Sequence, residues 1–323
     1  MSAFEVSRRR AQTTRFWRRA SPSTVFIQSM PRVPRDELAS LLADVRSSMP
    51  EAKVVWLDWA APVHLSHGWV LDEVDLYVKK HLLRDRSVYV KGLHDTNLAE
   101  YEAQFDPELL PPHQPGFERS LLDAKLVPGW NFGTVGPLRR ALANHADPAG
   151  PRRLAVHCRC ATQGSPWYTH LRERGMDAAR KLAFEPSVIS EDLVAPAEFW
   201  SELEQSRLCI SPFGYGEVCW RDFEAVAAGA LLVKPDMSHL ETNPDIYRPF
   251  ETYVPVAWDW SDLEERCAWA LESDERRIAI ARNAVEVWRE YLTDGWPSQF
   301  RALRTRLSAD RADPAREASE APK

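Results

Sequence analysis

The apolar positions in the second half of the chain fall into short runs, and stretches with helical spacing separate these runs. Short apolar runs bounded by Gly, Pro or polar residues are typical of buried strands. We expect strands at residues 153–158, 188–189, 208–211, 230–233 and 253–257, and helices at 166–183, 196–206, 218–228, 261–272 and 274–292. Because strands that alternate with helices form parallel βα units, residues 151–295 are predicted to be a doubly wound α/β domain.

The first half of the chain has a weaker pattern of the same kind. Strands are predicted at 25–28, 54–58 and 74–78, and a helix is predicted at 35–49. Between residues 92 and 137, Pro, Gly and aromatic residues interrupt the pattern, which indicates a long functional loop or an interdomain region. We interpret residues 23–150 as a smaller α/β domain and expect a further helix at 296–308.

Composition limits the class of protein. The 323 residues are 44% hydrophobic and 27% charged, enough to bury a core for about two domains. No uncharged apolar stretch approaches the roughly 18 residues that cross a bilayer, so we expect no transmembrane segment. The five cysteines are an odd number spread thinly along the chain, which fits a cytoplasmic protein better than a disulfide framework.

Charge distinguishes the N-terminal segment from the rest of the chain. Six arginines against Glu5 give residues 1–22 a charge of +5, which leaves −11 for the rest of a chain whose net charge is −6. We interpret residues 1–22 as a basic flexible tail, with a phosphate-rich partner or a targeting peptide as alternatives. The acidic remainder argues against nucleic acid as a partner. Residues 309–323 lack apolar residues for a core and are predicted to be disordered.

The segment from Ser211 to Asp236 contains the strongest candidate chemistry. Its turn Gly214-Tyr215-Gly216 follows a predicted strand, and doubly wound sheets bind ligands beyond the carboxyl ends of their strands. Glycine allows close backbone approach, and the free N–H groups that open the next helix favour an anion. A nucleotide pyrophosphate fits such a turn.

Two charged residues follow on the predicted helix. Arg221 and Glu224 are spaced i and i+3, so both can lie on one face of that helix. Arg221 can hold phosphate oxygens through its planar guanidinium, and Glu224 can accept both hydrogens of a ribose diol. The same pair can equally form a structural salt bridge, and the preceding glycine turn favours the ligand interpretation.

Residues 216–233 resemble the nucleotide-sugar segment of GT-B glycosyltransferases, in which an acidic helix residue precedes a small-residue run, a Gly and an apolar strand. The likeness is to bacterial group-one and CgeB-like transferases, with an exostosin-like echo, and extends over residues 150–295. It implies two Rossmann-like domains with a cleft between them. It also implies that Glu224 binds ribose, that Arg159 binds phosphate, and that Glu217 stands near a catalytic acidic position that Gly216 occupies here.

The expected function is transfer of a sugar from a nucleoside diphosphate sugar to a glycan, lipid-linked or small-molecule acceptor. Lys234 would neutralise the leaving diphosphate together with Arg221, and His239 would contact base or sugar. The chain has no Asp-x-Asp motif, so we expect no metal and no cofactor beyond the donor. The alternatives are a non-catalytic nucleotide-binding module and an epimerase or phosphorylase of the same fold.

Overall fold

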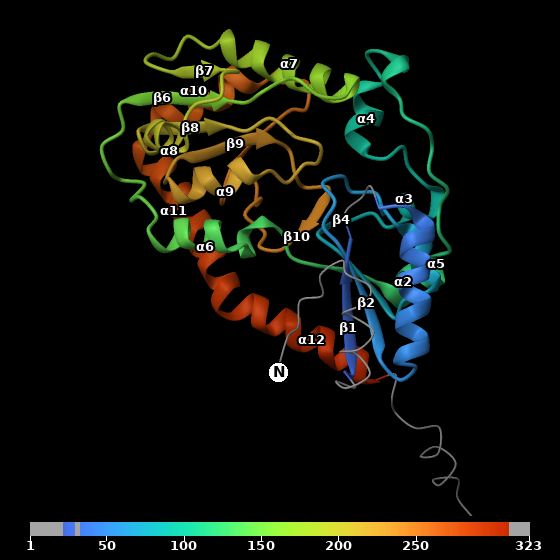
Figure 1. The fold of residues 1–323 in the computed structure, drawn as a ribbon. Coiled ribbons are helices and arrows are strands. Elements are labelled where there is room, and N and C mark those ends of the chain that lie inside the picture. Colours follow the sequence, from blue (N-terminus) through green and yellow to red (C-terminus); the bar gives the residue numbers. More distant parts are fainter. Residues whose placement is uncertain (1–21, 30–32, 310–323) are drawn as a thin grey trace, which may run out of the picture.

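A four-stranded parallel sheet, in the order β1-β2-β3-β5, is the centre of the first domain (Figure 1). The computed structural model describes residues 22–29 and 33–309. The strands are β1 (Thr24–Gln28), β2 (Lys53–Asp58), β3 (Leu76–Lys79) and β5 (Leu126–Pro128). Helix α2 (Arg35–Ser48) buries Leu38, Leu42 and Val45, which recur at helical spacing and form its apolar face. The predicted α/β character of this domain is confirmed.

The second domain contains a five-stranded parallel sheet in the order β11-β9-β8-β6-β7. Its strands are β6 (Leu154–Arg159), β7 (Val188–Ser190), β8 (Ser206–Ile210), β9 (Leu231–Pro235) and β11 (Val254–Val256). Its helices are α7 (Pro166–Arg180), α8 (Pro196–Glu204), α9 (Trp220–Ala227), α10 (Leu263–Glu272) and α11 (Asp274–Glu290). The predicted doubly wound domain is confirmed. Helix α9 begins two residues later than expected, because Val218 and Cys219 belong to the preceding turn.

The segment between residues 92 and 137 is more ordered than a long loop. It contains α4 (Asn97–Glu102), η2 (Pro107–Leu109), α5 (Arg119–Lys125), the strand β5, η3 (Phe132–Thr134) and the start of α6 (Gly136–Ala143); η1 (Gly68–Asp72) and α3 (Ser87–Lys91) precede it. The loop interpretation was therefore wrong for β5, which is three residues long and ends in a proline. Helix α4 contacts α7 of the second domain, so the segment does bridge the domains.

A two-stranded antiparallel sheet joins the domains in the middle of the molecule (Figure 1). Strand β4 (His81–Leu83) comes from the first domain, and β10 (Leu240–Thr242) comes from the second. An ion pair between Arg86 and Glu241 lies beside it. Neither strand was predicted, because three residues are too few to show a period.

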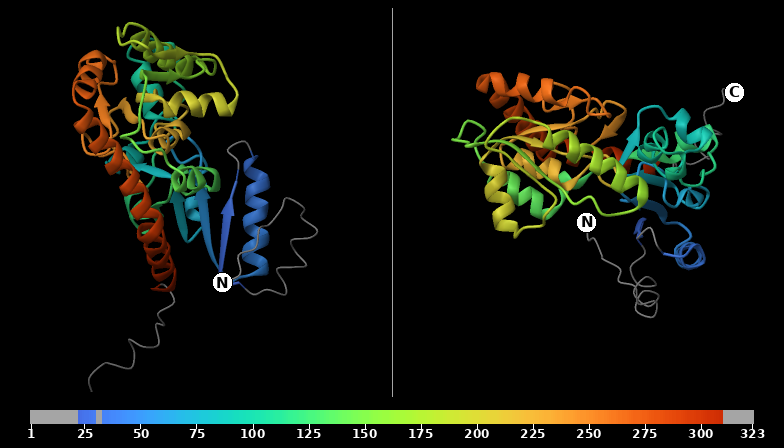
Figure 2. Two further views of the ribbon diagram at one scale, coloured as in Figure 1. Left: turned by 90° about the vertical axis from the view of Figure 1, so that its left-hand side faces the viewer. Right: turned by 90° about the horizontal axis from the view of Figure 1, so that it is seen from above.

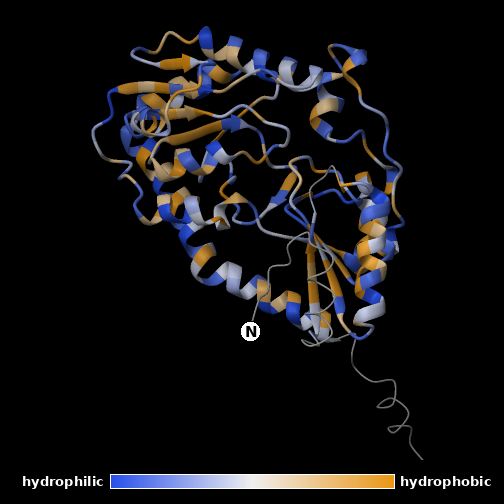
Figure 3. Cartoon of the chain, viewed as in Figure 1, coloured by the Kyte–Doolittle hydropathy of each residue, from blue (hydrophilic) through white to orange (hydrophobic). Residues whose placement is uncertain are grey.

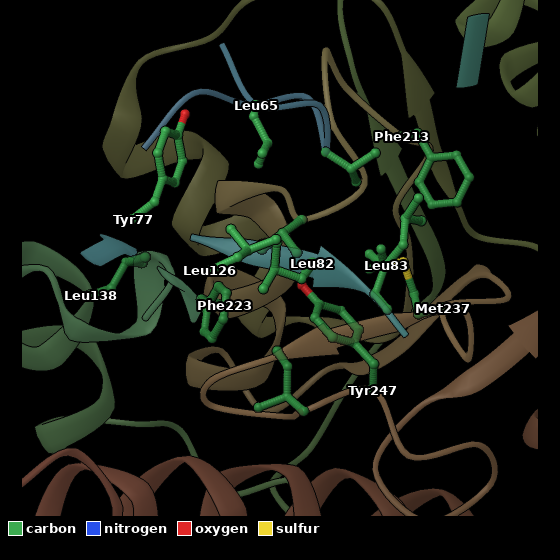
Figure 4. Close-up of a cluster of buried hydrophobic side chains, with 14 of the residues drawn as sticks. Leu65, Tyr77, Leu82, Leu83, Leu126, Leu138, Phe213, Phe223, Met237 and Tyr247 are labelled. Atoms are coloured by element: carbon green, nitrogen blue, oxygen red, sulfur yellow. The ribbon is translucent and has the colours of Figure 1, made fainter. Parts of the chain in front are cut away.

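The core is continuous across the domain boundary. Figure 4 shows Leu65, Tyr77 and Leu82 of the first domain in one cluster with Phe213 and Met237 of the second. Apolar residues concentrate in the strands of both sheets (Figure 3). The two domains therefore share buried surface in addition to the chain that links them.

The C-terminal helix returns from the second domain to the first (Figure 2). Helix α11 passes through the π-helical turn η4 (Tyr291–Gly295) into α12 (Trp296–Ala309), so the helix expected at 296–308 is present. Its Leu303 and Leu307 are buried in a cluster with Val55, Leu76 and Val78 of the first sheet. The tails expected at 1–22 and 309–323 lie, apart from Pro22 and Ala309, outside the described residues. No helix of the described ranges is long and apolar enough to cross a membrane.

Candidate functional site

The glycine turn after β8 lies against the first domain. A Cβ atom on Gly216 would lie 1.9 Å from the carbonyl oxygen of Ala61, so only glycine permits this contact. The Gly214 amide donates to the Gly216 carbonyl at 3.0 Å and tightens the turn. Tyr215 between them is 46% exposed and stacks on Tyr168 with ring centroids 4.1 Å apart. The close backbone approach expected for these glycines is thus made, in this structure, to the other domain.

A row of three titratable side chains crosses the domain boundary beside this turn. The Glu217 carboxylate is fully buried, with Oε2 3.4 Å from Nε2 of His81 and Oε1 3.6 Å from Nε2 of His239. Burial acts to raise the pKa of Glu217, but the two nearby rings outweigh it and hold that pKa below its usual range. His239 is the member of the row that reaches the surface, with 27% of its side chain exposed.

Arg221 connects the carboxyl ends of two strands. Its guanidinium donates to the Ser211 hydroxyl at 3.2 Å and to the carbonyls of Arg159 at 3.1 Å and Pro212 at 3.0 Å. Arg159 itself is held by α8, since it pairs with the Glu202 carboxylate at 2.7 Å and donates to the Asp192 carbonyl. The structure thus brings the two arginines together through a backbone carbonyl, and both guanidinium groups have partners within the protein.

Glu224 differs from these residues because no ion pair from the described part of the chain holds it. It lies one turn into α9 and is half-buried. Burial raises the pKa of Glu224 to about 7, an effect that the charge of Arg221 only partly offsets. A half-buried carboxylate with spare acceptor capacity is a suitable group for a diol.

Lys234 ends in a closed polar network. Its ammonium is fully buried, 3.2 Å from the Asp222 carboxylate and 3.2 Å from the Ser211 carbonyl. Asp222 also accepts hydrogen bonds from the Cys219 amide and the Tyr247 hydroxyl. This network fastens the start of α9 to β9.

The basic run Lys79-Lys80-His81 spans the end of β3 and the start of β4, and the sequence alone did not single it out. The Lys79 ammonium is fully buried, 3.2 Å from Asp58 and 3.3 Å from the Ala60 carbonyl. Burial acts to raise the pKa of Asp58, but Lys79, the Tyr77 hydroxyl and the Ala60 amide together lower it. The position of the run at a strand end was the signal that could have identified it.

Within residues 22–29 and 33–309, no group of three or more His, Cys, Asp or Glu side chains could hold a metal ion. The row beside the glycine turn consists of two imidazoles, those of His81 and His239, and the Glu217 carboxylate between them at the domain boundary.

Two parallel-stranded α/β domains that meet at the carboxyl ends of their strands define the GT-B fold, and solved structures with this chain's fold are GT-B glycosyltransferases. One is an alpha-glucosyltransferase in complex with UDP-glucose and DNA containing an abasic site, with a TM-score of 0.51 at 12% identity over 90% of this chain and 82% of that one. The alpha-glucosyltransferase (AGT) in complex with UDP gives 0.50 at 10% identity, over 91% and 83%. The predicted GT-B-like fold is confirmed.

A third similar structure is longer. TarM matches with a TM-score of 0.50 at 10% identity, over 87% of this chain and 54% of TarM, so this chain spans about half of that protein. No protein family and no curated protein matches the sequence.

Proposed function

We propose that this protein is a glycosyltransferase that moves a sugar from a nucleoside diphosphate sugar to an acceptor hydroxyl. The observation that carries the proposal is Glu224, a half-buried carboxylate free of ion pairs in the described chain, one turn into the helix that follows β8. In a GT-B fold this helix begins at the carboxyl edge of the sheet, where doubly wound domains bind nucleotides. Two solved structures with this fold contain UDP or UDP-glucose.

Glu224 is the proposed ribose ligand. An ionised carboxylate can accept one hydrogen bond from each hydroxyl of a diol, and these charge-assisted bonds are stronger than neutral ones. The amides at the start of α9 would then face the diphosphate, where the helix dipole favours negative charge. Membership of the CgeB-like group within the fold stays a prediction.

His239 is the proposed proton acceptor for the acceptor hydroxyl. It is the partly exposed member of the row, and the Glu217 carboxylate behind it can orient the ring and balance the charge gained with a proton. Because Glu217 is fully buried, it acts on the reaction only through His239, which makes it a positioning residue. This positioning role replaces the catalytic acidic position near which the resemblance placed Glu217.

The proposal keeps the reaction independent of metal, so side chains must balance the leaving diphosphate. Arg159, Arg221 and Lys234 were the expected cations, and each has partners within the protein. Any of them that serves the diphosphate must exchange those partners for the ligand. For the acceptor we propose only the chemical class, which is a glycan, a lipid-linked compound or a small molecule. The acidic remainder of the chain argues against nucleic acid, although one structure with this fold contains DNA.

Release of nucleoside diphosphate from a panel of UDP-, GDP-, ADP- and TDP-sugars tests the function. We expect slow release from one donor without acceptor, loss of that release in Glu224→Ala, and an unchanged melting temperature. Nucleotide binding without release would instead indicate a binding module. A new sugar nucleotide detected by mass spectrometry would indicate an epimerase, and a sugar phosphate formed with inorganic phosphate would indicate a phosphorylase.

A further inference from the structure

Lys80 is fully buried, and its side-chain nitrogen has no polar partner among the residues that the structure describes. It lies between β3 and β4, and none of its surface is exposed. Within the described residues its ammonium has no hydrogen-bond acceptor, and no carboxylate lies within 4 Å. Its Nζ lies over the ring of Phe132, 4.4 Å from the centroid. An aromatic face balances only part of the cost of burying an ammonium.

The neighbouring Lys79 is also fully buried, but its ammonium has polar partners. Successive residues of an extended chain point to opposite faces, so the two side chains leave β3 in different directions. Lys79 meets Asp58 and the Ala60 carbonyl, whereas Lys80 meets Phe132. Lys79 is part of the core of its own domain, whereas Lys80 contacts Phe132, whose ring packs on Trp220 of the other domain.

Two ring contacts connect Lys80 with the start of α9. The Phe132 ring that it contacts packs on Trp220, with centroids 5.4 Å apart, and Trp220 is the first residue of α9. Glu224 lies one turn further along the same helix. Helix α9 has eight residues, and its amino end favours an anion. The Phe132 ring thus contacts both the Lys80 ammonium and the first residue of α9.

We propose that Lys80 binds the diphosphate of the nucleotide donor together with the start of α9, so that the first domain supplies a cation of the donor site. This inference rests on the proposed function. The diphosphate would be the counter-ion of Lys80, which has none among the described residues. The Phe132 ring would have to rotate to let the diphosphate reach the ammonium. The same ammonium would then balance the charge that develops on the leaving group.

The titration of Lys80 agrees with this role. Burial, and to a lesser extent the charge of Lys79, lowers the pKa of Lys80 to about 7, while Cys219, Glu217 and Asp58 act in the opposite direction. Part of the protein therefore carries a neutral Lys80 near neutral pH. An anion beside the amine favours the ammonium form, so diphosphate binding above pH 7 should take up a proton.

Calorimetry with inorganic pyrophosphate, UDP and uridine tests the assignment in the full chain. Lys80→Met keeps the length of the side chain and removes the buried charge, so we expect it to melt at the same temperature as the wild type or higher. We expect at least a tenfold loss of affinity for pyrophosphate and UDP, and none for uridine. The exposed Lys91→Met is the matched control and should bind all three compounds normally.

The proton count gives a readout independent of affinity. Titrations of UDP at pH 8 in buffers of different ionisation enthalpy should show proton uptake by the wild type and by Lys91→Met, and none by Lys80→Met. Wild-type affinity and proton uptake in Lys80→Met would overturn the assignment and leave the proposed function intact. If the wild type bound none of the nucleotides and released none from sugar donors, the proposed function itself would fail.

Discussion

Oε2 of Glu217 lies 3.4 Å from Nε2 of His81, and both side chains are fully buried although they come from different domains. Burial lowers the pKa of His81 to about 4, so its ring is neutral at pH 7. The nearby Glu217 is ionised, because its pKa is held below the usual range. The boundary between the domains therefore contains a buried negative charge that faces one neutral ring and one partly exposed ring.

Glu217→Gln removes this charge at nearly constant volume. We expect turnover to fall by about 100-fold, because His239 loses the group that orients it, while UDP affinity changes little. Steady-state release of nucleoside diphosphate from the donor that the panel identifies and calorimetry with UDP measure the two quantities. Glu241→Gln is the control, since that carboxylate lies on β10 and pairs with Arg86. Equal turnover in the wild type and Glu217→Gln would count against the row as catalytic machinery.

Glu224→Gln tests the ribose contact and its pH dependence. The pKa of Glu224 is raised to about 7, and only the ionised form accepts hydrogen bonds from both hydroxyls. Its contribution to UDP affinity should therefore grow as pH rises through 7. We expect the variant to bind about tenfold more weakly at pH 8 and to differ much less at pH 5.5. A constant ratio of the two affinities from pH 5.5 to 8 would remove Glu224 from the donor site.

Arg221→Lys keeps the charge but cannot reproduce three separate donations to Ser211, Arg159 and Pro212. We expect the free energy of unfolding to fall by about 1–3 kcal/mol, because at least one buried acceptor loses its donor. Urea denaturation measures this change. The phosphate role of Arg221 stays a prediction: reduced turnover per folded molecule would support it, and unchanged turnover would leave a structural role alone.

Lys234→Met leaves Asp222 as a buried carboxylate without its cation. We expect a loss of about 3–5 kcal/mol of stability, and partial recovery in the double variant with Asp222→Asn. Recovery is incomplete because Asp222 also accepts from Tyr247 and the Cys219 amide. Denaturant titrations of the four proteins give the coupling energy. A coupling energy near zero would show that the ion pair does not stabilise the start of α9.

Gly216→Ala tests the contact between the domains. The new Cβ would lie 1.9 Å from the Ala61 carbonyl oxygen, which is backbone and cannot turn away. We expect the melting temperature to fall by several degrees, since about 1 kcal/mol shifts it by roughly 2–4 °C in a chain of this size. Gly136→Ala is the control, because its nearest neighbour is the end of the Arg140 side chain at 3.4 Å. Equal melting temperatures of the two variants would show that the contact between Gly216 and Ala61 can adjust at little cost in stability.

Much of the second domain could be predicted from local pattern. Strands β8 and β9 are buried on both faces over most of their length, so they coincide with the apolar runs at 208–211 and 230–233. Strands β4 and β10 could not be found in this way. Each has three residues, and their pairing joins positions such as Leu83 and Leu240 that only the tertiary fold brings together.

The candidate site, too, could be predicted from the sequence only in part. Glu224 and Arg221 were identified because they lie on one short, recognisable segment. Their partners were not, since the acceptors of Arg221 include the carbonyl of Arg159 on a different strand. Lys80 went unnoticed because a lysine at a strand end is ordinarily solvated, and its burial depends on Phe132, which lies far along the chain.

Helix α12 also governs the order in which this molecule can fold on the ribosome. Val55, Leu76 and Val78 are synthesised early, but Leu303 and Leu307, which cover them, follow the whole second domain. The second domain is one continuous stretch and can fold as it emerges, whereas the first must wait with one apolar sheet face open. The contact of α12 with the first sheet thus forms only after the second domain has been synthesised, and until then the open face is an apolar surface of the nascent chain.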